Sequence, residues 1–313
     1  MEDLLIMAGL LERLAKGEIL ISDGAMGTML QAAGLKAGEC PEAWCVTNPD
    51  AVRAVAQAYV DAGSDIIESD SFGGTSYKLK EFGEEHVTKV AEYNKAAAKI
   101  AKEVIGDSGF VAASVGTTGQ ILEDEGGMAT YDDIYNAYKE QMIALEAGGA
   151  DAVCIETQYS ALEAEAAIKA AKENTNLVVI CTFTFEAGAR GFRTMMGLTP
   201  ATATEAAVEA GADIVGANCG NGIENMIIIT KEMREVTDKP ILIHANAGLP
   251  ILEDGKTVFK ATPEEMAGKV AELVSAGANI IGGCCGTTPT HINAMSKAAK
   301  SCHKSDCQCG CNK

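Results

Sequence analysis

The sequence predicts a single (β/α)₈ barrel of parallel strands, a TIM barrel, with a short Cys-rich tail at its C-terminus. Two observations predict this fold. Eight short apolar runs alternate along the chain with eight helical patterns rich in Ala, Glu and Lys. Runs as apolar as these are typical of parallel strands that are buried on both faces. In addition, four of the runs belong to one segment that repeats without gaps.

The repeated segment predicts every second strand. Each copy looks like the C-terminus of a helix closed by Gly, followed by Asp or Asn and then by a buried strand. The four copies are AGSDIIESDS from Ala62, GGADAVCIET from Gly148, AGADIVGANC from Ala210 and AGANIIGGCC from Ala276. We interpret them as the second, fourth, sixth and eighth strands of the barrel.

The remaining strands and the helices fall between these copies in a regular order. We expect the odd strands at EILISDGA from Glu18, GFVAASVG from Gly109, LVVICTFTF from Leu177 and KPILIHAN from Lys239. We expect helices at residues 50–62, 86–105, 131–147, 160–174, 201–210, 222–236, 262–276 and 289–300, with one more at the start of the chain. Strand and helix therefore alternate throughout, as a closed parallel barrel requires.

A doubly wound open sheet is the alternative fold. It is disfavoured because no G-x-G-x-x-G motif follows the first strand, where DGAMGT places Asp23 at the position of the first glycine. No linker rich in Pro, Ser or Gly divides the chain. We therefore expect one barrel domain over residues 1–300 and a disordered Cys-rich tail over residues 301–313.

The composition argues against several classes of function. The 313 residues carry a formal net charge of −19, which leaves no basic surface for nucleic acid or for an anionic membrane. No run approaches the roughly 20 apolar residues that span a bilayer. The N-terminal segment has acids in place of the basic residues of an export signal. We expect a cytoplasmic protein whose eleven cysteines are reduced thiols with metal or catalytic roles.

The ninth and tenth positions of the repeat predict where function lies. In the four copies they hold Asp70 and Ser71, Glu156 and Thr157, Asn218 and Cys219, and Cys284 and Cys285. These positions end their strands, and barrel enzymes keep their chemistry at the C-terminal ends of the strands. Because Cys219 and Cys285 occupy matching places on neighbouring even strands, we expect them to converge with Cys284 at the mouth of the barrel.

Three converging cysteines predict a zinc site. Thiolates are soft ligands that suit tetrahedral Zn²⁺, and three protein ligands leave a fourth position for water or substrate, as in catalytic zinc sites. A structural zinc site would instead be closed by a fourth residue, for which His244 and His291 are candidates. The alternative is that Cys219, Cys284 and Cys285 simply pack the end of the barrel, since free cysteines are often buried.

Four motifs at the ends of predicted strands carry a family resemblance. They are DGAMGTML at 23–30, GANCGNG at 216–222, HANAGLP at 244–250 and GGCCGTTPTHI at 282–292. Together they resemble the zinc-dependent homocysteine S-methyltransferase family, and most of all the homocysteine module of cobalamin-dependent methionine synthase. The resemblance implies a barrel that methylates homocysteine to methionine, with Cys219, Cys284 and Cys285 as the zinc ligands.

The same resemblance implies contacts to the substrate. Asp23 and Glu156 match the family's acidic contacts to the ammonium group. The backbone N–H groups of Ala25 and Met26 would receive the carboxylate, as turn amides readily do for anions. Further candidates at predicted mouth positions are Asp70, Ser71, Thr157 and Asn246. Glu68, two residues before Asp70, is interpreted only as an internal ion-pair candidate.

The methyl donor is the least constrained part of the prediction. The synthase that the chain resembles normally carries further folate, corrinoid and reactivation modules, so we expect methylcobalamin on a separate corrinoid protein. S-methylmethionine or betaine is an alternative donor, although glycines in DSFGGTSYKL replace an aromatic residue that would help to cage a quaternary ammonium. Methylation of a different thiol stays open, and so does a non-enzymatic role in which the thiol-rich chain handles metal through its tail.

Overall fold

The computed structural model describes residues 2–253 and 256–301, and these form the predicted barrel. The eight strands are parallel and follow one another around the barrel in chain order. They are β1 (Leu20–Ile21), β2 (Ile66–Glu68), β3 (Phe110–Val115), β4 (Ala152–Gln158), β5 (Val178–Phe183), β8 (Ile214–Asn218), β9 (Ile241–Ala245) and β12 (Ile280–Gly283). The predicted fold class and strand positions are therefore confirmed. The predicted tail lies outside the described residues, apart from Ser301.

The barrel is nearly closed between β1 and β2. Across this seam the Asp65 N–H donates to the carbonyl of Ile21 at 2.7 Å. Farther along, Oδ2 of Asp23 accepts a hydrogen bond from the Glu68 N–H at 2.8 Å. The Asp23 carboxylate thus bonds to β2 where β1 itself has already ended.

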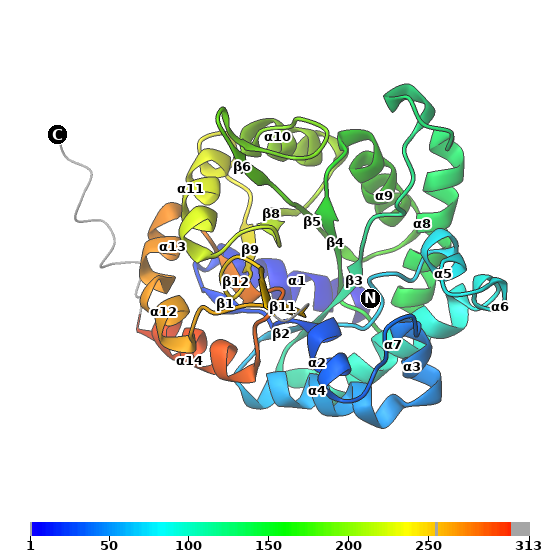
Figure 1. Cartoon of the computed structure of the whole chain (residues 1–313), viewed down its shortest axis with the longest axis horizontal. Helices are drawn as coiled ribbons and strands as arrows, with labels where there is room; N and C mark the ends of the chain where they lie inside the picture. Colours follow the sequence, from blue (N-terminus) through cyan, green and yellow to red (C-terminus); the bar gives the residue numbers. More distant parts are fainter. Residues whose placement is uncertain (1, 254–255, 302–313) are drawn as a thin grey trace.

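Helices form a ring around the sheet (Figure 1). They are α4 (Pro49–Asp61), α7 (Val90–Ile105), α8 (Tyr131–Ala147), α9 (Ala161–Asn174), α10 (Pro200–Ala210), α11 (Ile223–Arg234), α13 (Val270–Ala276) and α14 (Pro289–Lys300). Thr130, Ser160 and Thr199 cap α8, α9 and α10 by accepting first-turn N–H groups. Within residues 2–253 and 256–301, no helix combines the length and apolarity needed to cross a membrane.

Two of the predicted helices are divided in the structure. The range 86–105 begins inside α6 (Glu84–Val87) and includes α7, and the two helices are separated at Thr88 and Lys89. Val87 and Thr88 are β-branched residues of low helix propensity. The range 262–276 contains α12 (Pro263–Gly268) and α13, which meet at Lys269, directly after a glycine that is a poor helix former. The prediction of one continuous helix over each range is wrong.

The loops at the C-terminal ends of the strands contain short elements that the sequence pattern did not predict. They are the helices α2 (Met26–Ala32), α3 (Pro41–Thr47) and α5 (Ser76–Lys80), and two hairpins made of β6 (Glu186–Gly188) with β7 (Gly191–Arg193) and of β10 (Ile251–Glu253) with β11 (Lys256–Val258). Such elements are too short to show a hydrophobic period.

Alternate residues of the even strands face the barrel interior and form three layers. In the lowest layer, Ile66, Ala152, Ile214 and Ile280 pack with Leu10 and Leu14 of helix α1 (Glu2–Ala15), which lies across this end of the barrel. The middle layer holds Glu68, Cys154, Gly216 and Gly282, and the upper layer holds Asp70, Glu156, Asn218 and Cys284. The interior therefore changes from apolar to polar toward the C-terminal ends of the strands.

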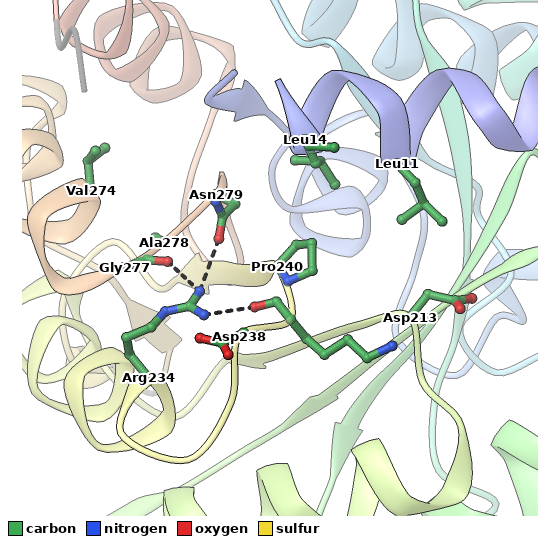
Figure 2. Close-up of a pocket in the computed structure, with 12 residues that line it drawn as sticks. Leu11, Leu14, Asp213, Arg234, Asp238, Pro240, Val274, Gly277, Ala278 and Asn279 are labelled. Carbon is green, nitrogen blue, oxygen red and sulfur yellow. Dashed lines mark hydrogen bonds between the residues drawn. The ribbon is translucent and has the colours of Figure 1, made fainter. Parts of the chain in front are cut away.

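The fourth position of the repeat makes the same contact in every copy, at the N-terminal end of the barrel. The side-chain oxygens of Asp65, Asp151, Asp213 and Asn279 accept hydrogen bonds from the backbone N–H groups of Ile21, Val111, Val179 and Ile241, at 3.0, 2.8, 2.9 and 3.1 Å. A cation from the helix before each of these odd strands completes the contact: Arg13, Lys102, Lys172 and Arg234. Figure 2 shows the fourth copy, in which Arg234 donates to Asn279.

Candidate metal centre

A cavity of about 410 Å³ opens at the C-terminal ends of the strands. Its walls come from the turn after β1, from the ends of β2, β3, β4 and β8, and from the turn after β12. Of the site residues predicted from the sequence, all except Asp23 and Asn246 line this cavity. The repeat therefore places most of these side chains around one volume.

The sulfur atoms of Cys219, Cys284 and Cys285 form one cluster in the cavity wall. The Sγ atoms of Cys219 and Cys285 lie 3.8 Å apart, and the three Sγ atoms all lie within 4.8 Å of one another. A tetrahedral zinc ion with Zn–S bonds of about 2.3 Å holds its sulfurs about 3.8 Å apart. The spacing of the sulfurs therefore fits a zinc ion.

Two turns, both tied to β9, aim these sulfurs. Cys219 follows β8 with a φ of +58°, in the left-handed region that non-glycine residues rarely adopt. The paired cysteines follow β12 and precede Gly286, whose φ is +78°. The Cys219 N–H donates to the His244 carbonyl at 3.1 Å, and the Cys284 N–H donates to the Ala245 carbonyl at 2.8 Å. Because β9 lies between β8 and β12, it holds the two turns in register.

The three thiols share their protons unequally. Hydrogen bonds from Cys284 and Cys285 lower the pKa of Cys219 far below its usual range. The same contacts, together with burial, raise the pKa of Cys284 and of Cys285. The cluster therefore stabilises one thiolate, at Cys219, and further thiolates at this spacing require a cation among the sulfurs.

Asn246 provides a second observation that fits a metal. Its Oδ1 is buried and has no hydrogen-bond partner among the described residues. Its side chain lies near the Cys219 sulfur and contributes to the lowered pKa of that thiol. A buried amide oxygen without a partner is costly, so Asn246 keeps an acceptor available near the three sulfurs.

Neither histidine considered as a fourth ligand belongs to the cluster. In the described part of the chain, no fourth His, Cys, Asp or Glu atom joins the three sulfurs. His291 uses both ring nitrogens elsewhere, with Nδ1 at Thr288 and Nε2 at the Ala261 carbonyl, 2.9 Å away. His244 is buried below the sulfurs, where burial lowers its pKa to about 4. The structure therefore does not support a site closed by histidine.

Glu156 is held in place in the cavity wall by two neighbouring side chains. Ser114 Oγ donates to Oε1 of this carboxylate, and Asn218 Nδ2 donates to Oε2 at 2.9 Å. Burial raises the pKa of Glu156 to about 7, although the hydrogen bond from Ser114 lowers it. A buried carboxyl with such a pKa gains strongly from a cationic ligand.

Asp23 lies behind the cavity wall, in the seam of the barrel. Its Oδ2 accepts from the Glu68 N–H, and its Oδ1 lies 3.3 Å from Ser22 Oγ. Burial raises the pKa of Asp23 to about 7, against the hydrogen bonds that lower it. Both carboxylate oxygens of Asp23 therefore already have protein donors, and Asp23 does not line the cavity directly.

The turn after β1 presents backbone amides to the cavity. The Ala25 N–H already donates to Thr287 Oγ1 at 3.2 Å. Met26 begins α2, whose first turn has no side-chain cap from the described residues. The amide of Met26 is therefore freer to receive an anion than the amide of Ala25.

The lower-ranked candidates already have contacts to the protein. Asp70 Oδ2 lies 3.7 Å from the Cys45 sulfur, and burial raises the pKa of Asp70 to about 8, with a further contribution from the charge of Glu42. Ser71 Oγ donates to the Ser114 carbonyl at 2.7 Å. Thr157 has a φ of +60°, which is rare for a β-branched residue.

Glu68 faces the cavity from the layer below Asp70, and the sequence did not predict a role for it there. Its Oε1 is buried without a hydrogen-bond partner in the described chain, and His244 Nδ1 lies 3.8 Å away. Burial raises the pKa of Glu68 and lowers that of His244, so both shifts favour the neutral pair. Glu68, which the sequence offered only as an ion-pair candidate, therefore has His244 as its neighbour, in a pair that these shifts keep neutral.

Three residues that hold the site together were missed by sequence reasoning. Ser114 and Thr182 lie on odd strands, whose ends share no repeat that could align them. Asn218 occupied the ninth position of the repeat, beside a predicted metal ligand, and that position was the available signal. Their roles depend on hydrogen bonds between strands.

A second cavity, of about 620 Å³, lies at the opposite end of the barrel (Figure 2). Leu11 and Leu14 of α1 lie on one side of it and Arg234 on another. The Arg234 guanidinium already donates to the carbonyls of Lys239 and Gly277 and to Asn279 Oδ1. No cysteine or histidine lines this cavity among the described residues, so the mouth cavity is the better candidate for chemistry.

Comparison with known sequences relates the chain to methyltransferases. The profile of the family described as homocysteine S-methyltransferase matches residues 20–299. A methionine synthase of Mycobacterium leprae is 29% identical over 94% of this chain, and one of Mycobacterium tuberculosis is 28% identical over 90%. The chain spans about a quarter of the length of these relatives.

Comparison with solved structures supports the same fold. The metallated form of the homocysteine methyltransferase MmuM from Escherichia coli superimposes with a TM-score of 0.74 at 22% identity. The match covers 91% of this chain and 97% of that one. At this identity the likeness shows that the two chains share the barrel fold.

Proposed function

The chain belongs to the homocysteine S-methyltransferase family, and from this premise we propose that it transfers a methyl group to the thiolate of homocysteine to give methionine. The observation that carries the proposal is the composition of one cavity, which has three clustered sulfurs and a buried carboxyl in its walls. Sulfur ligands suit a metal that activates a thiol. A buried carboxyl suits the ammonium group of an amino acid.

The sulfurs of Cys219, Cys284 and Cys285 would hold zinc, with Asn246 Oδ1 beside them as an oxygen donor. Bound zinc would keep an alkyl thiol, whose ordinary pKa is about 8.5, deprotonated at neutral pH. The chain then needs no general base at the methyl carbon, because positioning of the sulfur and of the donor carries most of the rate.

The acidic wall of the cavity would orient the substrate. Glu156 would receive the ammonium group, and this contact would lower its pKa from about 7 and favour the charged carboxylate. Asp23 would add negative charge from behind the wall. The first-turn amides of α2, from Met26 onward, would receive the substrate carboxylate. Holding both groups directs the substrate sulfur toward the thiol cluster.

We also propose that the donor is methylcobalamin carried by a separate corrinoid protein that docks over the mouth. Large apolar side chains are exposed on the loops after β2, β3, β5 and β9, at the same end of the barrel as the cavity, and we call this set the rim: Phe72, Ile121, Met128, Met195, Met196, Leu249, Ile251 and Leu252. Exposed apolar groups gathered in one region are typical of an interaction surface. Phe72 alone offers a benzene or indole ring to the cavity among its described lining, whereas quaternary ammonium donors are usually caged by several such rings.

The first test supplies the protein with each donor in turn. Reduced, zinc-loaded protein is incubated with homocysteine and with methylcobalamin, betaine or S-methylmethionine, and methionine is measured. Among these three free donors, we expect only methylcobalamin to yield methionine. Failure of all three free donors leaves a methylated corrinoid protein as the required substrate, and failure with that protein too would contradict the proposal. The variant Cys219→Ala serves as the inactive control.

The second test addresses the rim. The double variant Met128→Asp, Leu252→Asp charges two side chains that are 93% and 75% exposed. We expect methylation by a corrinoid protein to fall about tenfold or more, because the charges oppose an apolar contact, while methylation by free methylcobalamin is unchanged. Ile143→Asp, which charges an exposed apolar residue of α8 that is not part of the rim, is the matched control.

A further inference from the structure

We propose that Asn218 is a positioning residue that sets the preference of the site for an amino-acid thiol by holding the Glu156 carboxylate. The inference rests on the proposed function, in which Glu156 receives the substrate ammonium. Asn218 is the last residue of β8 and directly precedes Cys219. It therefore lies between the part of the site that would bind sulfur and the part that would bind the ammonium group.

The side-chain amide of Asn218 is fully buried and uses all of its hydrogen-bonding groups. Nδ2 donates to Glu156 Oε2 at 2.9 Å and to Thr157 Oγ1 at 2.8 Å. Oδ1 accepts from the Thr157 N–H at 2.7 Å and from Thr182 Oγ1 at 2.8 Å. Since a side-chain amide has two donor hydrogens and two acceptor lone pairs, these four bonds determine its orientation.

The Glu156 carboxylate is fixed from two sides by neutral donors. Ser114 Oγ donates to Oε1 and Asn218 Nδ2 donates to Oε2. Each carboxylate oxygen can accept a further hydrogen bond, so an ammonium group could bind without displacing either donor. Without the Asn218 amide, one oxygen would lose its donor and the carboxylate would be free to turn away from the ligand.

Asn218 also lies between two residues with unusual backbone conformations. Thr157 and Cys219, with φ values of +60° and +58°, are the non-glycine residues with positive φ in the described chain. Such conformations are costly and persist where surrounding contacts determine them. Asn218 supplies those contacts to Thr157, because Oδ1 accepts from the Thr157 N–H and Nδ2 donates to the Thr157 hydroxyl. A peptide bond joins Asn218 to Cys219. The amide therefore orders the ammonium side of the site, while the sulfur side is held by the backbone contacts to β9.

This arrangement has a specific consequence for ligand choice. The thiol 4-mercaptobutyrate matches homocysteine in chain length, carboxylate and sulfur, but it lacks the ammonium group. Only homocysteine would benefit from an oriented Glu156 carboxylate, because charge-assisted hydrogen bonds depend on direction. Loss of the Asn218 donor should therefore weaken homocysteine binding and leave 4-mercaptobutyrate binding nearly unchanged.

The test is a calorimetric titration of zinc-loaded protein with each of the two thiols. It compares the wild type with Asn218→Leu, which keeps a similar side-chain size but has neither donors nor acceptors, and with Asn218→Ala, which removes the amide. We expect homocysteine to bind roughly 10- to 100-fold more weakly to both variants, the range for loss of a hydrogen bond to a charged group. Binding of 4-mercaptobutyrate and the zinc content should stay within about twofold of wild type.

Two further variants complete the test, one as a milder change at the same hydrogen bonds and one as a control for lost stability. Thr182→Val removes only the hydroxyl that orients Asn218 Oδ1, so the preference for homocysteine should fall by a few-fold; it keeps the test decisive if the Asn218 variants do not fold. Asn279→Ala removes amide contacts at the opposite end of the barrel. It should lower stability without changing the ratio of the two affinities.

The outcomes separate this inference from the proposed function. Equal weakening of both thiols, or loss of zinc, in the Asn218 variants would make Asn218 a structural residue and overturn the inference. If Glu156→Gln removes the preference for homocysteine but the Asn218 variants retain it, only the role of Asn218 fails. If Glu156→Gln leaves the preference intact, the ammonium binds elsewhere, and both the proposed role of Glu156 and the inference fail.

Discussion

The two ends of the even strands use one repeated segment in different ways. At the N-terminal ends, the fourth position of every copy accepts a hydrogen bond from the preceding odd strand and meets a cation from the helix before that strand. At the C-terminal ends, the ninth position differs in all four copies, and the tenth position is Ser, Thr or Cys. These positions supply an Asp–Ser, a Glu–Thr, an Asn–Cys and a Cys–Cys pair.

The difference follows from what the backbone requires at each end. Where an odd strand begins, an N–H of its first or second residue needs an acceptor in every repeat, and a short carboxylate or amide side chain meets that need in the same way each time. Where an even strand ends, the chain enters a loop of its own length and shape, so the position is free to carry chemistry. The repeated residue type at the N-terminal ends therefore indicates a role in stability, and the differing residue types at the C-terminal ends indicate the candidate site.

The largest expected effect comes from removing a sulfur at the C-terminal ends of the strands. Cys285→Ala should abolish stoichiometric zinc binding and lower methyl transfer by about 10³-fold or more, because the sulfur nucleophile would lose its activation. Cys181→Ala, which truncates a fully buried thiol in β5, should keep both properties. Zinc analysis and a methionine assay on the two proteins make the comparison, and a metal-replete, active Cys285→Ala protein would disprove the metal site.

The next largest effect comes from removing one of the repeated acids at the N-terminal ends of the strands. The Asp151 side chain is 5% exposed, pairs with Lys102 at 2.9 Å and accepts from the Val111 N–H. Asp151→Ala should lower the free energy of unfolding by about 3–5 kcal/mol, because it leaves a partly buried charge and an N–H without partners.

Urea unfolding measures that change, and Glu103→Ala is its control. Glu103 pairs with Arg53 on the surface, where both side chains are more than 40% exposed, so its loss should cost less than about 1 kcal/mol. Folded Asp151→Ala protein should retain wild-type zinc content. A selective loss of zinc there would show that the two ends are not separable.

A third prediction concerns pH and the C-terminal end alone. Burial raises the pKa of Asp23 and Glu156 to about 7, that of Asp70 to about 8, and that of Glu68 well above its usual value. A carboxyl with a raised folded pKa contributes stability that is complete below the unfolded pKa of about 4 and is lost as pH rises through the folded value. The lowered pKa values of Cys219 and His244 act in the opposite direction, but these are two groups against four.

The free energy of unfolding of reduced, zinc-free protein should therefore fall between pH 5 and 8, by on the order of a few kcal/mol. Urea unfolding at several pH values measures the slope. Glu156→Gln should make the slope shallower, since it removes one of the titrating groups. Stability that rises across this range would contradict the assignment of these acids to a buried, unpaired environment.

The smallest expected effect comes from making the four repeated residues at the N-terminal ends alike. Asn279 is the only amide among the four equivalent residues, and it faces Arg234. Asn279→Asp keeps the oxygen that accepts from the Ile241 N–H and adds an ion pair with a half-buried guanidinium. We expect a gain of up to about 1 kcal/mol in the free energy of unfolding, with methyl transfer unchanged. A loss of stability would mean that the amide was needed at this position.

Much of the fold followed from local patterns. The Gly-x-Asp strand repeat predicted the even strands and the order of elements, and its tenth position brought Cys219 and Cys285 to one end of neighbouring strands. The divided helices at 86–105 and 262–276 were missed because a single β-branched pair or glycine interrupts an otherwise continuous hydrophobic period. The rim hairpins were missed because three-residue strands have too few positions to define an alternation.

The sequence by itself determined the spacing of the repeat, the alternation that turns Glu156 and Cys284 toward the interior, and the convergence of three thiols. These features depend on residues close together in the chain and on the geometry common to all parallel barrels. Tertiary structure alone decided that Asp23 bridges the seam, that Asn246 lies against Cys219, and that Asn218 holds Glu156. These contacts join strands that are distant in sequence, and the direction of a hydrogen bond is settled only when those strands are packed together.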